Sequence, residues 1–225
     1  MKKYILIILD GAADLTKVNG QTPLQIARTP NLDFFTENGV TGIMKTLYED
    51  LPKGSIVAQL GILGFDPYLY YPNGRSSCEA LALGINLSPT DLSFRANLAL
   101  VENNILKSYN ANYISTYKAK RLVKKINQNL KTSFPDFELY NNSDFRNTLV
   151  LRDTKINPKD LLCVEPHENI GAKLDFDHLI KSCNGKTSRG LDRLNQYISE
   201  ASKLLANDEA NTIMPWSASS ALKLP

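Results

Sequence analysis

A short apolar run that ends at a carboxylate most constrains the fold of this chain. The run covers residues 3–9, and Asp10 and Gly11 follow it directly. An uninterrupted β-prone segment of this length predicts a strand that is covered on both faces, as in a parallel sheet. Ligands of open α/β sheets bind at the carboxyl ends of the strands. The sequence therefore predicts a buried strand with Asp10 at the ligand-binding edge of the sheet.

Helix and strand patterns alternate after this run. Residues 22–27 predict a short helix, with Thr at the cap position and Pro in the first turn. A second helix is predicted from residue 30 to Gly39, and a strand at residues 40–46. A loop rich in breakers then leads into the apolar stretch 56–63, with Ser55 at the amino end of a helix. The alternation, which extends to about residue 85, predicts an α/β layer architecture.

From about Ser93 the pattern changes to that of an α+β module. Strands are predicted at residues 94–101, 105–109, 137–140, 148–152 and 161–164, and a helix at 116–131 with its apolar residues on one face. A further amphipathic helix ends at Leu205 and is capped by Thr187 or Ser188, while the last fifteen residues show no period. We therefore expect an α/β domain at residues 1–90 plus 186–225, interrupted by an inserted α+β domain at residues 91–185.

Composition and charge exclude several classes of protein. Lys and Arg number 26 against 23 Asp and Glu, and a net charge of +3 is too small to indicate nucleic-acid binding. The segment 103–133 holds seven Lys or Arg and no acids; we interpret it as the solvated face of a helix, with RNA binding as the alternative. No apolar run approaches the roughly 20 residues of a membrane span. Three cysteines without metal-type spacing indicate reduced thiols, so we expect a cytoplasmic protein.

Asp10 and Ser55 together are candidates for phosphoryl transfer. A metal ion on the carboxylate would lower the pKa of the serine hydroxyl, and the free backbone N–H groups at the helix end would hold the phosphoryl oxygens. The alternative for each residue is structural, with Asp10 as a strand-end cap and Ser55 as a helix cap.

An ordered series of motifs runs along the whole chain. It comprises Asp10-Gly11, Thr22-Pro23-Leu24, Thr29-Pro30-Asn31-Leu32-Asp33, Gly54-Ser55, Leu63-Gly64-Phe65-Asp66-Pro67, Gly74-Arg75, Glu79-Ala80, Phe94-Arg95-Ala96-Asn97-Leu98, Pro166-His167 and Ala210-Asn211-Thr212-Ile213. The series resembles the archaeal-type, cofactor-independent (2,3-bisphosphoglycerate-independent) phosphoglycerate mutase family of the alkaline phosphatase superfamily. That family includes a bacterial homoserine kinase-like branch, to which the ending Pro215-Trp216-Ser217 is nearer.

The resemblance implies an alkaline phosphatase-like parallel-sheet domain that carries two divalent metal ions, Mn²⁺ or Mg²⁺ with Zn²⁺ as an alternative. Asp10 and Ser55 match metal ligands of the family, and Ser55 also matches the serine that carries the phosphoryl group. Arg95, Arg146 and His167 fall in motifs of the insert that hold the substrate. The alternatives are that His167 is a plain loop histidine and that Arg95 projects outward from its strand.

The sequence departs from the family pattern at several positions. Ile56 follows Ser55 where the family has an acid, Gly74-Arg75 is followed by two serines, and residues 111–113 lack a basic side chain. The family continues beyond the position of Pro225 into a half that bears Asp and His metal ligands, whereas this chain has two histidines in all. A two-metal site needs about six or more ligands. We therefore expect the front part of a longer protein, a second chain that completes the site, or a degenerate relative, and with it an exposed strand edge or apolar patch.

The function that the resemblance implies is the interconversion of 3-phosphoglycerate and 2-phosphoglycerate in glycolysis through a phosphoserine at Ser55. The alternatives are a homoserine kinase-like phosphotransferase that acts on another small metabolite, and a non-catalytic relative that binds an anionic metabolite or a protein partner. The expected partners are a small phosphorylated metabolite and a second chain, either another copy or a different protein, that completes the sheet. Neither a membrane nor nucleic acid is expected.

Overall fold

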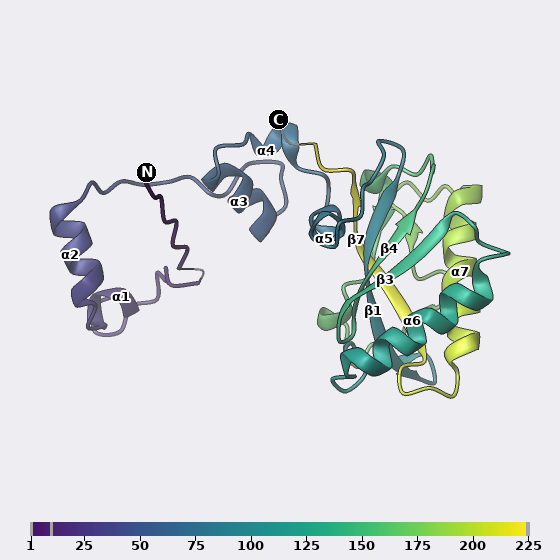
Figure 1. Cartoon of the computed structure of the whole chain (residues 1–225). Helices are drawn as coiled ribbons and strands as arrows, with labels where there is room; N and C mark the ends of the chain where they lie inside the picture. Colours follow the sequence, from purple (N-terminus) through teal and green to yellow (C-terminus); the bar gives the residue numbers. More distant parts are fainter. Residues whose placement is uncertain (1, 10, 224–225) are drawn as a thin grey trace. The chain divides into compact units, whose positions relative to one another are not determined.

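The computed structural model describes residues 2–9 and 11–223, which form two compact units (Figure 1). The first unit, Met1–Lys45, contains helix α1 (Pro23–Ile26) and helix α2 (Pro30–Asn38), as predicted. Thr22 caps α1, because its hydroxyl accepts a hydrogen bond from the backbone N–H of Gln25. Both helices begin with proline, which has no N–H to leave unpaired in a first turn.

The strands predicted at residues 3–9 and 40–46 are absent from the described residues, and this prediction is corrected. Neither segment has a ladder partner, and the only pairing described in residues 2–9 and 11–45 is the isolated bridge between Val18 and Gln21. A strand forms only against a neighbour that takes its N–H and C=O groups. Asp10 lies outside the described residues.

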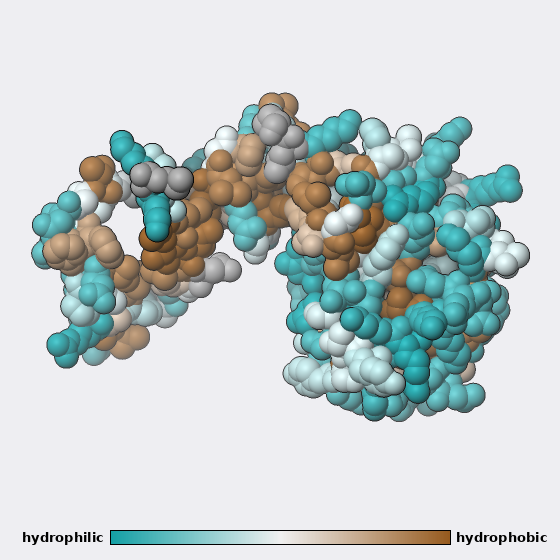
Figure 2. Space-filling view, in the orientation of Figure 1, coloured by the Kyte–Doolittle hydropathy of each residue, from teal (hydrophilic) through white to brown (hydrophobic). Residues whose placement is uncertain are grey.

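The first unit exposes much apolar side-chain surface instead (Figure 2). Tyr4 is 90% exposed and Ile5 85%. Other exposed apolar residues of this unit are Leu6, Ile7, Ile8, Leu9, Phe34, Phe35, Val40, Ile43 and Met44. An exposed apolar patch was expected, and the structure confirms it; what covers the patch stays a prediction.

The second unit, Thr46–Pro225, begins with three short helices. They are α3 (Ser55–Ile62), α4 (Pro67–Tyr70) and α5 (Ser76–Ala82). The helix predicted to start at Ser55 is therefore confirmed. Asp66 caps α4 by accepting a 2.9 Å hydrogen bond from the backbone N–H of Tyr68.

A five-stranded antiparallel sheet follows. Its strands are β1 (Leu92–Glu102), β2 (Ile105–Ser108), β3 (Phe137–Ser143), β4 (Arg146–Leu151) and β7 (Thr212–Ser220). The order is β2-β1-β4-β3, and β7 pairs with β1. A second, two-stranded sheet joins β5 (Leu161–Leu162) to β6 (Lys181–Ser182), and 3₁₀ turns occupy Pro158–Asp160 and Pro166–Glu168. The fold is thus mixed α/β, as expected, but every described strand pair is antiparallel, so the predicted parallel sheet is not among them.

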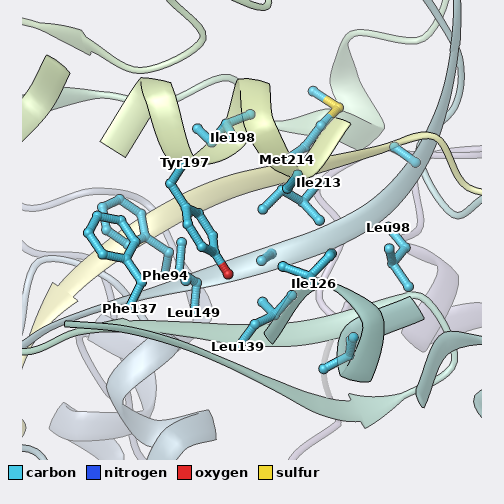
Figure 3. Close-up of a cluster of buried hydrophobic side chains, with 14 of the residues drawn as sticks. Phe94, Leu98, Ile126, Phe137, Leu139, Leu149, Tyr197, Ile198, Ile213 and Met214 are labelled. Carbon is cyan, nitrogen blue, oxygen red and sulfur yellow. The ribbon is translucent and has the colours of Figure 1, made fainter. Parts of the chain in front are cut away.

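Two long helices cover one face of the large sheet and form the core with it. They are α6 (Thr116–Leu130), capped by Ser115, and α7 (Arg189–Leu205), capped by Ser188. Alternate residues of β1 contribute to this core, because successive side chains of a strand point to opposite faces. Figure 3 shows Ile126 of α6 and Tyr197 and Ile198 of α7 against Phe94, Leu98, Leu139, Leu149 and Ile213 of the sheet.

Strand β7 was not predicted, since no period was found at the end of the chain. Residues 212–216 are buried without alternation, Pro215 interrupts the β-prone pattern, and Ser217 has a φ of +52°. The predicted division into domains as a whole stays a prediction. The strand pairing nevertheless places α7 and β7 with the module predicted for residues 91–185. In the part of the chain that the structure describes, no helix has the length and apolarity to span a membrane.

Candidate anion-binding site

Helix α5 lies against the face of the sheet that the polar residues of β1 occupy. The Ser76 hydroxyl donates a 2.7 Å hydrogen bond to the carbonyl oxygen of Ser93, and its oxygen is 2.6 Å from the Ser219 hydroxyl. All three serines are buried. Ala80 of the same helix packs against Val150 of β4. These contacts join α5 to β1, β4 and β7 and fix the side chains that α5 presents.

Gly74 lets the chain reach the sheet just before α5. A Cβ at this position would collide with the carbonyl oxygens of Ser217 and Ala218, so only glycine permits this approach to β7. The next residue, Arg75, donates its backbone N–H to the Ser217 hydroxyl at 3.3 Å. Arg75 is thereby held at the bulge of β7, with its exposed guanidinium 5.7 Å from the centre of the Trp216 ring.

Arg95 of β1 is the most enclosed cation of the site, at 9% exposure. Its Nε lies 2.9 Å from the Glu79 carboxylate, and its guanidinium lies 4.3 Å from the centre of the Trp216 ring. Burial lowers the pKa of the Arg95 guanidinium, and the charges of Arg75 and Arg146 lower it further, whereas the Glu79 carboxylate raises it. Arginine stays protonated in proteins even so, and the Arg95 guanidinium therefore keeps its positive charge.

Trp216 joins the parts of the site. Its indole N–H donates to the Asn97 side chain at 3.0 Å, and Asn97 in turn donates to the backbone oxygen of Tyr109 at 3.0 Å. The ring of His167 lies 5.3 Å from the Trp216 ring and 6.4 Å from that of Tyr109. Thus Arg75, Arg95 and His167 all surround one indole.

Arg146, at the start of β4, completes the cationic group. Its guanidinium lies 4.3 Å from the Phe145 ring and 3.8 Å from the Asp144 carboxylate. That ion pair is long and both side chains are about half exposed, so it contributes little. The structure therefore brings together Arg95, Arg146 and His167, the three residues predicted to hold substrate. Their binding of a substrate stays a prediction.

The guanidinium groups differ in how closely a carboxylate pairs with them. Glu79 is the carboxylate that contacts Arg95 at short range, while Arg75 has no ion pair among the described residues. Guanidinium groups carry parallel N–H donors that match the oxygens of carboxylates and phosphates. The arrangement can thus bind a small anion through the buried Arg95 together with the exposed Arg75 and Arg146.

Ser55 is the first residue of α3, follows the N-cap residue Gly54 and is exposed. No side chain among the described residues caps this end, so its first backbone N–H groups can bind an anion. Among the described residues, no hydrogen bond or ion pair joins Ser55 to the arginine group. The pairing of Ser55 with Asp10 stays a prediction, because Asp10 lies outside the described residues.

The described residues do not fit a two-metal site at Ser55. Over residues 2–9 and 11–223, one group of His, Cys, Asp and Glu residues has its ligand atoms within 4.8 Å of one another: Glu165, His167 and Glu168. All three are exposed, and the Glu165 carboxylate is 3.6 Å from Nε2 of His167. Neither Ser55 nor His178, which contacts Asp175, belongs to this group.

The sequence reasoning gave no role to three residues of the site: Arg75, Glu79 and Trp216. Arg75 and Glu79 do lie in the motifs Gly74-Arg75 and Glu79-Ala80, and Trp216 is the single tryptophan of the chain. The single tryptophan is the sequence signal that points to the site, because this residue type is enriched at the centres of binding interfaces. The contact between Arg95 and Trp216 itself follows only from strand pairing.

Comparison with known sequences identifies one protein family. A family model described as 2,3-bisphosphoglycerate-independent phosphoglycerate mutase matches residues 36–211. A protein of that name from Pyrococcus horikoshii is 34% identical over 216 residues, which are 93% of this chain and 50% of the relative. The enzyme of the same name from Methanosarcina barkeri is 35% identical over 77% of this chain and 43% of its own length. The chain spans about half the length of the curated relatives that it matches.

Solved structures agree with the sequences. A cofactor-independent phosphoglycerate mutase from Thermoplasma acidophilum superposes with a TM-score of 0.56 and 25% identity, over 92% of this chain and 56% of that one. A protein from Pyrococcus horikoshii shares the fold, with a TM-score of 0.60 and 24% identity over 92% of this chain and 48% of its own.

Proposed function

This chain belongs to the 2,3-bisphosphoglycerate-independent phosphoglycerate mutase family, and from this premise we propose that it supplies the substrate-holding module and the phosphoryl-accepting serine of a phosphoglycerate mutase. The activity is the interconversion of 3-phosphoglycerate and 2-phosphoglycerate. Phosphorylated three-carbon acids are small, strongly anionic metabolites of glycolysis, so the proposed place of action is the cytoplasm.

The observation that carries the proposal is the arrangement of Arg75, Arg95 and His167 around Trp216, with Arg146 near enough for its charge to lower the pKa of the Arg95 guanidinium. Phosphoglycerate has a phosphate dianion at one end and a carboxylate at the other. Two exposed guanidinium groups and one buried guanidinium group can engage both ends at once, each through paired hydrogen bonds. A substrate held in this way presents its hydroxyl and phosphate in one fixed order, which favours transfer between neighbouring oxygens.

Ser55 is the proposed acceptor of the phosphoryl group. Its oxygen attacks phosphorus, the bond between phosphorus and the substrate's C3 oxygen breaks, and the serine proton passes to the departing oxygen. In a second transfer, the C2 oxygen attacks phosphorus, the bond between phosphorus and the serine oxygen breaks, and the proton of the C2 hydroxyl passes to the serine. The free N–H groups of the first turn of α3 support this role, because they can hold the phosphoryl oxygens as charge accumulates there.

Dependence on two divalent ions, Mn²⁺ or Mg²⁺ with Zn²⁺ as the alternative, is likewise a proposal for the complete enzyme. Bound ions would neutralise charge on the transferring group. The trio Glu165, His167 and Glu168 is the set of potential ligands found among the described residues, and it does not include Ser55. An alkaline phosphatase-like fold for residues 1–90 plus 186–225, completed by a second chain or another copy, belongs to the same proposal.

Two experiments test the proposal, one at the substrate-holding residues and one at Ser55. In the first, calorimetric titration measures binding of 3-phosphoglycerate to the full chain and to Arg146→Met. Loss of one guanidinium contact should weaken binding about tenfold. The matched control is Arg121→Met, because Arg121 is an exposed arginine of α6 at 4.0 Å from Asp208, outside the site. Equal affinities of the two variants would remove Arg146 from the binding site.

In the second experiment, mass spectrometry of the intact chain follows a covalent phosphoryl group after incubation with 3-phosphoglycerate and Mn²⁺. Ser55→Ala should abolish the adduct, whereas Ser133→Ala, at another exposed serine, should retain it. An adduct that survives in Ser55→Ala would place the phosphoryl group on a different residue.

The second candidate function is phosphoryl transfer with another small metabolite as substrate, and one structural observation favours it. Ala111, Asn112 and Tyr113 form a left-handed turn, with φ values of +48°, +54° and +62°, and carry no basic side chain. Strained, non-glycine turns of this kind concentrate at functional sites. Titration with O-phosphohomoserine beside 3-phosphoglycerate separates the two candidates, and binding of both without turnover would identify a non-catalytic relative.

A further inference from the structure

An irregularity in strand pairing places Trp216 over Arg95. The register of β1 and β7 shifts between Ser93 and Arg95, and after the shift Arg95 pairs directly with Trp216. Ser217, next to the tryptophan, takes up the extra length in a left-handed conformation with a φ of +52°. A bulge re-aims the side chains beside it, and here it brings an indole face onto a guanidinium.

The Trp216 ring is itself fixed. It is 5% exposed, and its N–H donates to Asn97, whose amide is anchored on the backbone of Tyr109. A buried indole with a satisfied N–H has no room to rotate and no polar group left to pair. It therefore offers Arg95 a rigid surface at 4.3 Å.

The planar guanidinium group of Arg95 is restrained on one face and along its Nε edge. Trp216 covers the face, and the Glu79 carboxylate binds the Nε edge at 2.9 Å. Among the described residues, no hydrogen bond uses the terminal amino groups of Arg95. Since a guanidinium has five N–H donors in one plane, the two restraints leave the terminal edge oriented and free.

We propose that Trp216 is a positioning residue: it sets the plane of the Arg95 guanidinium so that its terminal edge meets an anionic substrate. Trp216 touches neither the reacting atoms nor, on this account, the anion. Its effect on binding passes wholly through Arg95. The inference rests on the proposed function for the identity of the anion, but the order that Trp216 imposes on Arg95 exists without any ligand.

The first test needs no ligand. NMR relaxation of the Arg95 side-chain Nε–H is compared in the wild-type chain, Trp216→Leu and Trp216→Phe, with circular dichroism as the check on folding. Phe keeps an aromatic face over the cation and should keep the Nε–H rigid; Leu removes the face and should make it mobile. An Nε–H that stays rigid in Trp216→Leu overturns the proposal, whether or not the chain proves to be a mutase.

The second test asks whether the effect passes through Arg95. Binding of 3-phosphoglycerate should weaken about tenfold in Trp216→Leu and less than about threefold in Trp216→Phe. In an Arg95→Met background the same Trp216→Leu change should have no further effect. Equal losses in both backgrounds would show that Trp216 acts independently of Arg95 and would overturn the proposal.

Fluorescence separates this inference from the proposed function. Trp216 is the single tryptophan, so emission of the whole chain reports on this one ring. Titration of the wild-type chain with 3-phosphoglycerate should change the emission, and Arg95→Met should abolish the change. An absent response to 3-phosphoglycerate and to inorganic phosphate in the wild-type chain contradicts the proposed function, while the relaxation measurement still decides the positioning role.

Discussion

Asp91 is a single carboxyl that joins two segments. It accepts hydrogen bonds from the backbone N–H groups of Ser88 at 2.9 Å and Asp153 at 3.1 Å, and from the Arg152 guanidinium at 2.8 Å. Burial by itself raises the pKa of the Asp91 carboxyl. The hydrogen bonds from Ser88, Arg152 and Asp153 outweigh burial and hold this pKa at about 2.

Because the pKa of Asp91 is low, the free energy of unfolding should depend on pH in the acidic range. A carboxyl whose pKa is lower in the folded chain than the unfolded value of 3.8 stabilises the fold above that value. This contribution, about 2 kcal/mol, should be lost as the pH falls from about 4 to about 2. Asp91→Asn should lower the free energy of unfolding at neutral pH by a similar amount and should lack this part of the pH dependence.

Urea unfolding at several pH values measures the effect. The matched control is Asp177→Asn, at an exposed carboxyl, which should keep the acid dependence of the wild-type chain. If Asp91→Asn still loses stability steeply between pH 4 and 2, other carboxyls cause the loss. Asp136 and Glu138, whose pKa values are also lowered, would then be the next candidates.

At the scale of elements, asparagine amides pair with the backbone of single residues. Asn195 of α7 accepts from the backbone N–H of Ile180 at 3.0 Å and donates to its carbonyl at 2.8 Å. Asn211 makes the same pair of bonds with Val101, at 2.9 and 2.7 Å. A side-chain amide can thus replace a neighbouring strand for one residue.

The two asparagines should differ in their contribution to stability. Ile180 is 1% exposed, so Asn195→Ala leaves a buried N–H and C=O unpaired and should cost about 2–3 kcal/mol. Val101 is only half-buried, and water can pair its backbone in Asn211→Ala, which should cost about 1 kcal/mol. Chemical denaturation of both variants measures the difference. Equal costs would show that water reaches both sites or neither.

Periodicity in the sequence predicted the two long helices well and the strands unevenly. Helices α6 and α7 each have one apolar stripe facing the sheet, which is a local property of the sequence. The run at 3–9 has the composition of a buried strand, but strand formation also needs a partner, which no local pattern supplies. Strand β7 shows the converse, because pairing with β1 forms a strand in spite of Pro215.

The same distinction holds for the candidate site. Arg95, Arg146 and His167 were found through motifs, since residue type and order are written in the sequence. The contacts of Trp216 and Glu79 with Arg95 were not found, because residues 79, 95 and 216 meet only when α5, β1 and β7 assemble.

For the whole molecule, the two units should differ in stability. The second unit has a continuous buried core between its sheet and two helices. The first unit has short helices, exposed apolar side chains and, over residues 2–9 and 11–45, no buried residue. Local opening costs least where few apolar contacts and few hydrogen bonds must break. The backbone of residues 3–9 should therefore open far more readily than that of β1.

Amide hydrogen exchange of the full chain tests this difference. Amides of β1 and α7 should exchange on the order of a thousandfold or more slowly than those of residues 3–9, since only the former need global unfolding to open. The measurement is repeated over a range of protein concentrations. Protection of residues 3–9 that rises with concentration would mean that another copy covers the apolar patch. Protection equal to that of β1 at every concentration would contradict the structure of this segment and restore the strand that its composition predicts.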